Sequence, residues 1–347
     1  HPNTGFNLGG DRPLPPLPPV FGADLRWKGN GQWTTFDMTQ VATYADGKSL
    51  MFDLAGDNSQ TINIDQSLNA TTLYLMNPSG HDYSFSGTGT TGSGQLIKSM
   101  QGTVTFNASL EHTGKTIISE GPLNVNGTVA GPVELRAKGT LGGNVMLKDT
   151  ITFEGALNHE GCRLALGDGF SNENTTPGIK SKKSMVLPGN VYLELTADVF
   201  DQECPNCPSE AVCGNLYVLG NLTFRGTNYI TVNLQANDAA TYVLAQCTGT
   251  LTCDPSKLKT RGLEGINYDL KVEDNRLLLI INSTREATSD VVWTGAESSQ
   301  WDYKAQNFVL GGTTDNKTTT FVPDDAVVFT DEGQQKNVTL NEMMPID

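Results

Sequence analysis

Short apolar and β-branched runs alternate with glycine-rich corners from Gly87 to Gly169, and helical periodicity is nearly absent there. Valine, isoleucine and threonine suit the pleated, half-buried surface of a strand, whereas glycine accepts the positive φ that tight corners need. The pattern therefore predicts strands joined by turns. The predicted strands of this stretch lie at residues 95–98, 103–106, 116–119, 123–125, 133–135, 144–147 and 150–153.

Short strands at close spacing fit two architectures, a parallel β-helix and a β-sandwich. The runs are short for a large sandwich, and many of the connections are brief and contain Gly, Asn or Asp, which turn a corner without hairpin geometry. We therefore predict an all-β protein built as a parallel β-helix, with the β-sandwich as the alternative. Because one coil cannot bury its inward face alone, stacked coils must supply the core.

The later strands alternate more strictly between apolar and polar residues. The order polar, apolar, polar, apolar occurs in residues 231–234 and again in residues 269–272. Such alternation is typical of a sheet with one face in water. It predicts an antiparallel capping sheet near the end of the β-helix.

A sequence unit near the start of the chain recurs near its end. The first copy contains Trp27 and Trp33, the second contains Trp293 and Trp301, and two further apolar runs follow in each. We therefore divide the chain into three parts. Residues 1–23 are the end of a preceding module with a proline-rich linker, 24–287 are one β-helix unit with an insertion near 200–255, and 288–347 open a second copy.

The tryptophans of the repeated unit allow two interpretations. In one they pack over the first coil and shield its open end, because an uncovered sheet edge invites pairing with other strands. In the other they form, with nearby tyrosines, an exposed platform on which a sugar stacks. The candidate binding residues are Trp33, Tyr44, Trp301 and Tyr303.

The chain is acidic, with 38 acidic and 23 basic residues and a net charge of −15. This charge argues against nucleic acid and anionic membranes as partners, since both need Lys and Arg to neutralise them. It is also mildly unfavourable for binding polyuronides. No apolar stretch is long enough to span a bilayer, so we expect no direct membrane insertion.

Several segments resemble the autotransporter-associated β-strand repeat. The resemblance rests on the order of residues 94–98, 102–106, 112–116, 120–123 and 139–143, and the strands after residue 190 are similar to the closing part of such units. It implies a right-handed β-helix on a secreted or surface-exposed protein of a Gram-negative bacterium, or in its periplasm, and it implies no reaction. Residues 2–10 are faintly similar to the end of rhamnogalacturonan lyase catalytic domains.

Cysteines set this chain apart from that family, whose members usually lack them. Because the count is even and the chain resembles secreted proteins, disulfides are the favoured interpretation, with Cys247 bonded to Cys253 and a second bridge within the first cluster. Zinc is disfavoured, because five residues rather than two separate Cys247 from Cys253. The disulfide candidates are Cys204, Cys207, Cys213, Cys247 and Cys253.

No recognised catalytic motif is present, and we assign no catalytic residue and no cofactor, with calcium left as an open alternative. Carboxylates and lysines that could serve a polysaccharide lyase are Asp149, Glu154, Glu160 with His159, Asp168, Lys180, Lys182 and Lys183, none of them in a known pairing. We expect a non-catalytic structural or carbohydrate-binding module, covalently linked to neighbouring domains, whose partner is a polysaccharide or surface glycan. The alternatives are a β-helix polysaccharide lyase of pectin or rhamnogalacturonan type and an adhesin-like spacer.

Overall fold

The protein is all-β, as expected from its short β-branched runs. A computed structural model describes residues 23–55, 61–155, 161–166, 178–197, 215–234, 240–263, 266–282, 288–313, 317–322 and 324–340. Within these ranges the regular elements are strands, apart from one short 3₁₀ helix at Pro255–Lys257.

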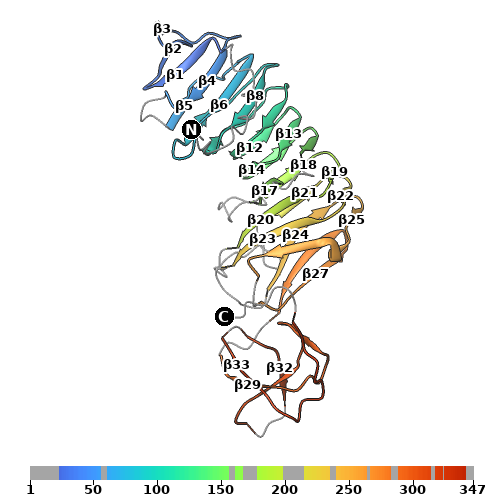
Figure 1. The fold of residues 1–347 in the computed structure, drawn as a ribbon. Coiled ribbons are helices and arrows are strands. Elements are labelled where there is room, and N and C mark those ends of the chain that lie inside the picture. Colours follow the sequence, from blue (N-terminus) through green and yellow to red (C-terminus); the bar gives the residue numbers. More distant parts are fainter. Residues whose placement is uncertain are drawn as a thin grey trace, which may run out of the picture.

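Three parallel sheets run along the molecule (Figure 1). Sheet A contains β4 (Ser49–Asp53), β6 (Thr72–Met76), β8 (Gln95–Ser99), β10 (Thr116–Ile118), β13 (Val133–Arg136) and β16 (Ile151–Glu154). Sheet B contains β5 (Thr61–Ile64), β7 (Tyr83–Gly87), β9 (Val104–Asn107), β11 (Gly121–Val125), β14 (Gly139–Gly142), β17 (Cys162–Ala165), β20 (Val191–Ala197), β23 (Asn228–Leu234) and β26 (Leu258–Arg261). Sheet C contains β12 (Gly127–Val129), β15 (Val145–Leu147), β18 (Gly178–Ser181), β21 (Asn215–Val218) and β24 (Ala240–Cys247).

Consecutive strands belong to different sheets, which defines a parallel β-helix. Strand β10 lies in sheet A, β11 in sheet B and β12 in sheet C, and the next three strands repeat this order. A short sheet D, formed by β19 (Met185–Leu187), β22 (Leu222–Phe224) and β25 (Leu251–Thr252), continues from β16 along the face of sheet A. The β-helix interpretation is therefore confirmed, and the sandwich alternative is wrong.

The core consists of rows of equivalent residues from successive coils. Leu50, Leu73 and Leu96 are partners in adjacent strands of sheet A, and all three are buried. In sheet B, Phe85 and Phe106 stack with ring centroids 4.5 Å apart and planes 8° apart. Each row extends its neighbour's apolar surface, so one coil is stable only when the next covers it.

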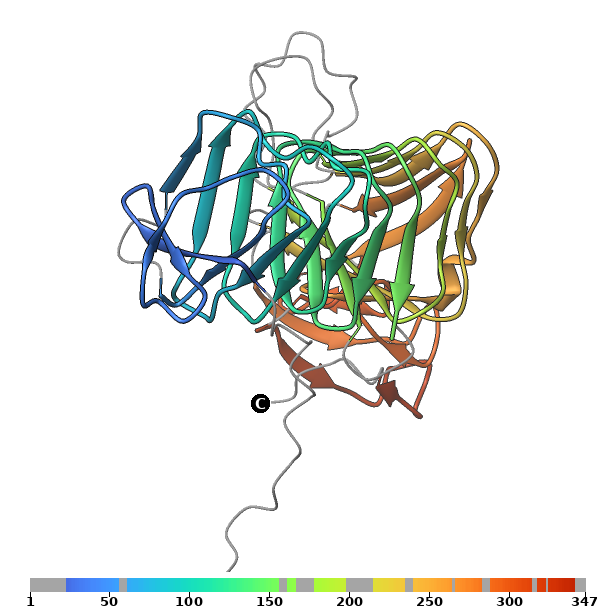
Figure 2. The same cartoon turned by 90° about the horizontal axis from the view of Figure 1, so that it is seen from above.

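Glycine at the corner before sheet A permits the tight stacking of coils. A Cβ atom on Gly114 would collide with the backbone carbonyl oxygen of Gly94 in the preceding coil. Figure 2 shows these closely stacked corners from above. Glycine is required at this position because the neighbouring backbone atoms cannot move aside for a Cβ atom.

Antiparallel hairpins close both ends of the β-helix. At the first end β1 (Leu25–Gly29), β2 (Gln32–Thr35) and β3 (Val41–Ala42) extend sheet A beyond β4. At the other end β27 (Tyr268–Glu273) and β28 (Arg276–Ile281) pair antiparallel beside β24, with Leu277, Leu279 and Ile281 in the core. The predicted antiparallel cap is confirmed for residues 269–272 of β27, whereas residues 231–234 lie in β23, which pairs in parallel with β20 and β26.

A lysine and a histidine, both titratable, lie inside the core. Lys98 of β8 is buried, and its Nζ donates hydrogen bonds to the backbone carbonyls of Ser99, Met100 and Glu120 at 3.1, 2.7 and 3.1 Å. Burial lowers the pKa of Lys98 to about 8.

His112 is the second buried titratable group. Its two ring nitrogens each lie 2.9 Å from a threonine hydroxyl, one from Thr90 and one from Thr116. Burial lowers the pKa of His112 to about 4, so its neutral ring is favoured and both threonines serve as hydrogen-bond partners.

The last strands form a separate small unit beyond the second hairpin (Figure 1). One sheet contains β29 (Asp290–Trp293), β31 (Phe308–Leu310), β32 (Thr318–Thr319) and β33 (Ala326–Phe329), and a second contains β30 (Gln300–Trp301) and β34 (Thr339–Leu340). Its core is distinct from that of the β-helix. Lys304 joins it to β27 through an ion pair with Asp269, with 3.2 Å between Nζ and Oδ1.

Candidate functional site

The first pair of predicted binding residues packs at the N-terminal end of the β-helix. Trp33 is only 8% exposed and contacts Trp27 and Phe52 edge-on, at centroid distances of 5.2 and 5.3 Å. Tyr44 is half-buried, and its hydroxyl donates to Asp46 and accepts from the backbone N–H of Asn69. This geometry supports shielding of the open end rather than a platform for a sugar.

The second pair belongs to the core of the C-terminal unit. Trp301 packs against Phe308 and Phe321, and Tyr303 packs against Phe321 with ring centroids 5.7 Å apart. Trp301 is also not the counterpart of Trp33. In the strand register Trp27 faces Trp33, whereas Trp293 faces Phe308.

The predicted disulfide between Cys247 and Cys253 is absent, and both residues are free thiols. Each packs against the apolar core at its own place, Cys247 at the end of β24 and Cys253 just after β25. Burial raises the pKa of Cys253 to about 12, which keeps the thiol protonated. Cys204, Cys207 and Cys213 lie outside the described residues.

The lyase-type candidates that can be placed do not converge. Glu154 ends β16 in sheet A, whereas Lys180 lies in β18 of sheet C with its Nζ 5.1 Å from the ring centroid of Tyr217. The side chain of Asp149 accepts a hydrogen bond from the adjacent Thr150 amide. Lys182 and Lys183 are exposed next to β18. His159, Glu160 and Asp168 lie outside the described residues.

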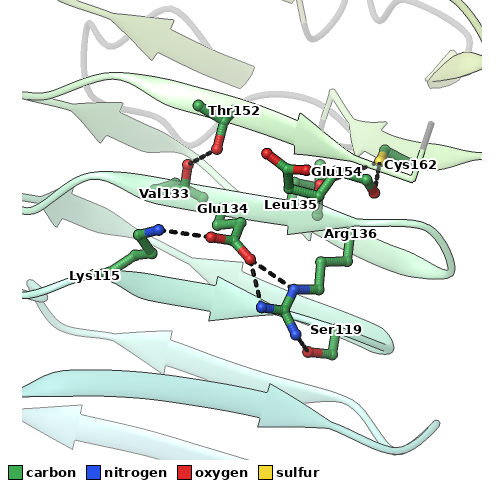
Figure 3. A network of polar contacts seen from close by, with 9 residues as sticks. All are labelled: Lys115, Ser119, Val133, Glu134, Leu135, Arg136, Thr152, Glu154 and Cys162. Carbon is green, nitrogen blue, oxygen red and sulfur yellow. Dashed lines mark hydrogen bonds and ion pairs between the residues drawn. The ribbon is translucent and has the colours of Figure 1, made fainter. Parts of the chain in front are cut away.

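One ion network occupies the outer face of sheet A (Figure 3). Glu134 accepts from Lys115 at 2.7 Å and from Arg136 Nε at 2.7 Å, so both oxygens of its carboxylate are engaged. Burial alone would raise the pKa of Glu134, but the bonds from Lys115 and Arg136 outweigh it and lower that pKa. Cys162, seen in the same view, donates from Sγ to the Leu135 carbonyl at 3.2 Å. Because the carboxylate has partners on both sides, we interpret the network as structural.

A cluster on the outer face of sheet B has a different character. We call it the Tyr192 patch, and it consists of Arg163, Tyr192, Glu194, Tyr229 and Arg261. These residues come from four neighbouring strands, β17, β20, β23 and β26, which pair in parallel. Tyr192 and Tyr229 are direct partners in register, so their side chains leave the sheet side by side.

The two tyrosine rings form a stack flanked by guanidinium groups. Their centroids are 4.5 Å apart and their planes differ by 9°. The Arg163 guanidinium carbon lies 5.1 Å from the centroid of Tyr192, and that of Arg261 lies 5.3 and 5.2 Å from Tyr192 and Tyr229. Cation–π contacts at this distance hold the long arginine side chains in defined positions.

The arginines differ in what else they bind. Arg163 makes an ion pair with Glu194, with 3.1 Å between Nη1 and Oε1. Burial raises the pKa of Glu194, and Arg163 partly opposes this. Arg261 is exposed and makes no ion pair within the described part of the chain. Among the described residues, the guanidinium N–H groups of Arg261 have no hydrogen-bond acceptor.

An open depression adjoins the patch at the corner between sheets A and B. Its lining comes from corner residues of three successive coils and from Arg163, which belongs to both features, and its volume is about 370 Å³. The lining residues are Gln101, Glu120, Gly121, Lys138 and Arg163. It holds one carboxylate beside two cationic side chains.

The sequence contained a signal for the patch. Tyr192 and Tyr229 each immediately precede a fully buried residue, Leu193 and Ile230, so alternation places both tyrosines on the outer face. The contact between the two tyrosines depends on the register between β20 and β23. No local sequence pattern predicts this register.

Among the described residues, no group of three or more His, Cys, Asp and Glu side chains could hold a metal ion. The same residues include no helix of sufficient length and hydrophobicity to cross a bilayer. No protein-family model matches the sequence, and a search of curated proteins found no relative.

Proposed function

We propose that this chain is a non-catalytic β-helix module that binds an acidic glycan through the Tyr192 patch. The observation that carries the proposal is the guanidinium of Arg261, held over two stacked tyrosine rings with no acidic partner among the described residues. In line with the resemblance to autotransporter repeats, the module belongs to a secreted or surface protein of a Gram-negative bacterium that handles glycans.

The geometry favours recognition of an acidic group over stacking of a neutral sugar. Each ring of the patch has a face turned to the other ring, and guanidinium groups lie over the stack. Tyr192 is only 6% exposed, so a ligand meets the guanidinium groups rather than an open ring face. A guanidinium presents paired N–H donors that match a carboxylate or sulfate in two parallel hydrogen bonds.

Local charge distinguishes this face from the rest of the molecule. The net charge of −15 repels polyanions at long range. Near the patch, however, Lys138 lines the adjoining depression and Lys259 is the register partner of Tyr229. Together with Arg163 and Arg261 these lysines outnumber Glu120 and Glu194. The long-range repulsion by the net charge opposes the local attraction by the patch. We therefore predict that acidic glycans bind weakly and that salt changes their affinity.

The patch also has the shape that a polymer needs. It crosses four strands, and parallel neighbours lie about 4.8 Å apart, so it extends for roughly 14 Å along the β-helix axis. An extended glycan laid along this face would contact consecutive coils in the same way.

A binding assay with Arg261→Gln tests the proposal. Immobilised polyuronides, sulfated glycans and neutral glycans are each titrated with the full chain at low and moderate salt, with and without EDTA. We expect binding to the acidic glycans alone, weaker with salt and unchanged by EDTA, and at least tenfold weaker in Arg261→Gln. Arg225→Gln is the matched control, because Arg225 is an exposed arginine in the turn between β22 and β23 and is not part of the patch.

Three results would contradict the proposal. Equal loss of affinity in Arg261→Gln and Arg225→Gln would indicate diffuse charge attraction rather than a site. Release of reducing or unsaturated ends from the same glycans would show a lyase or hydrolase. No binding to any glycan would leave a spacer, as in an adhesin, as the function.

A further inference from the structure

The C-terminal unit repeats the topology of the N-terminal cap. In the cap the strand order is β3, β2, β1, β4, with β1 antiparallel to β2 and parallel to β4. In the C-terminal unit the order is β32, β31, β29, β33, with β29 antiparallel to β31 and parallel to β33. Each of these four strands in one unit thus has a counterpart in the other.

The strand registers of the two units bring aromatic residues to equivalent positions. Leu25 pairs with Leu50, and Val291 pairs with Val327. Two residues further along each second strand, Phe52 and Phe329 hold equivalent positions. Phe52 lies 5.8 Å from Trp27 at an interplanar angle of 37°. Phe329 lies 6.1 Å from Trp293 at the same angle.

The two phenylalanines differ in what covers them. In the cap β6 pairs in parallel with β4, Leu75 is the partner of Phe52, and Phe52 is fully buried. In the C-terminal unit β33 is an edge strand within the described residues, and Phe329 is 53% exposed. Val328 and Leu340 are 47% and 43% exposed. An apolar edge strand of this kind is a template for a further strand.

We propose that β33 is the docking surface for the first coil of a further β-helix unit of the same construction. A strand equivalent to β6 would add in parallel to β33 and cover Phe329 with the counterpart of Leu75. The next strand of that coil, equivalent to β7, would cover Leu340 beside β34. The C-terminal unit is then the cap on which another β-helix assembles, independently of any glycan site.

A tandem protein for testing this arrangement can keep the spacing of the first unit. Seven residues, 65–71, separate Ile64 of β5 from Thr72 of β6, and seven residues, 341–347, follow Leu340. A copy of residues 72–287 joined directly after Asp347 therefore keeps the spacing of the first unit.

Hydrogen exchange on this tandem protein tests the proposal. In the parent chain, amides of β33 that do not bond to β29 face the open edge. We expect these amides to exchange at least tenfold more slowly in the tandem protein, because the added strand accepts their hydrogen bonds. A matched tandem variant carries Leu73→Asp and Leu75→Asp in the added copy only, and its β33 should exchange at the parent rate.

A second variant separates docking from folding of the added copy. Phe329→Asp in the tandem protein leaves the added sequence intact but places a charge under its first strand. We expect loss of β33 protection while the added copy still unfolds cooperatively. The proposal is overturned if the added copy folds and β33 exchanges at the parent rate. It is also overturned if β33 in the parent is already protected by self-association, seen as a dimer in sedimentation.

Discussion

The ammonium group of Lys98 donates a hydrogen bond to the backbone carbonyl of Glu120, 3.1 Å away, from within the core of the β-helix. In the strand register Lys98 has Leu75 on one side and Ile118 on the other, so it interrupts an apolar row. Three backbone carbonyls replace the water that an exposed lysine would bind. The core therefore retains a charge whose hydrogen bonds are satisfied but whose solvation is poorer than in water.

This relationship predicts that stability rises in alkaline solution. The folded pKa of about 8 lies below the unfolded value of 10.5, so between these values the unfolded chain binds the extra proton. Raising the pH from 8 to 10 should therefore stabilise the wild type by about 2 kcal/mol relative to Lys98→Met, which lacks the titrating group. Urea unfolding of both proteins across this range measures the difference. A constant difference would show that Lys98 titrates normally.

His112 predicts a pH response of the same sign at the acidic end. Its folded pKa of about 4 lies below the usual 6.5, so acidification protonates the unfolded chain first and stability falls. Between pH 7 and pH 4.5 the wild type should lose about 2 kcal/mol more than His112→Gln. Thermal or urea unfolding of the pair isolates this group from the carboxylates, which titrate in both proteins. Parallel curves for the two proteins would contradict the prediction.

The local sequence predicted most of the strands between Gly87 and Gly169 and favoured the β-helix over the sandwich, because side-chain alternation and glycine corners are short-range signals. It also contained the position of Lys98, since Leu96 two residues earlier is buried and alternation turns both residues inward. Contacts between coils were harder to predict from the local sequence. The order of tryptophans in the repeated unit matches Trp33 with Trp301, but the hairpin of β29 and β31 places Phe308 opposite Trp293. That register depends on packing across a long connection.

The corner glycines predict a steric limit on coil stacking. Gly114→Ala would place a methyl group against the backbone carbonyl of Gly94. Neither group can rotate away, because the methyl carbon is attached to the Cα atom and the carbonyl belongs to the main chain. The two coils must therefore move apart. We expect a loss of about 3 kcal/mol in the free energy of unfolding. The control is Gly47→Ala, where φ is +76° and no atom lies within 4 Å, so only the left-handed backbone cost of roughly 1 kcal/mol applies. Equal effects of the two substitutions would show that the coils can relax at this corner.

Arg163 predicts the behaviour of the carboxylate beside it. Burial raises the pKa of Glu194, and the Arg163 guanidinium partly restores the charged form. Arg163→Gln should therefore raise the pKa of Glu194 further, which a carbon-detected NMR titration of the carboxyl group measures directly. Because the folded pKa then lies further above its unfolded value, Arg163→Gln should lose stability relative to the wild type as the pH rises past the folded pKa of Glu194 in the wild type, which itself lies above 4.5. Arg163→Lys keeps the charge without the planar guanidinium, so it should preserve the Glu194 titration while weakening the contact with Tyr192. If the pKa of Glu194 is the same in all three proteins, the ion pair does not govern its charge, and Glu194 remains a poorly solvated carboxylate controlled by burial alone.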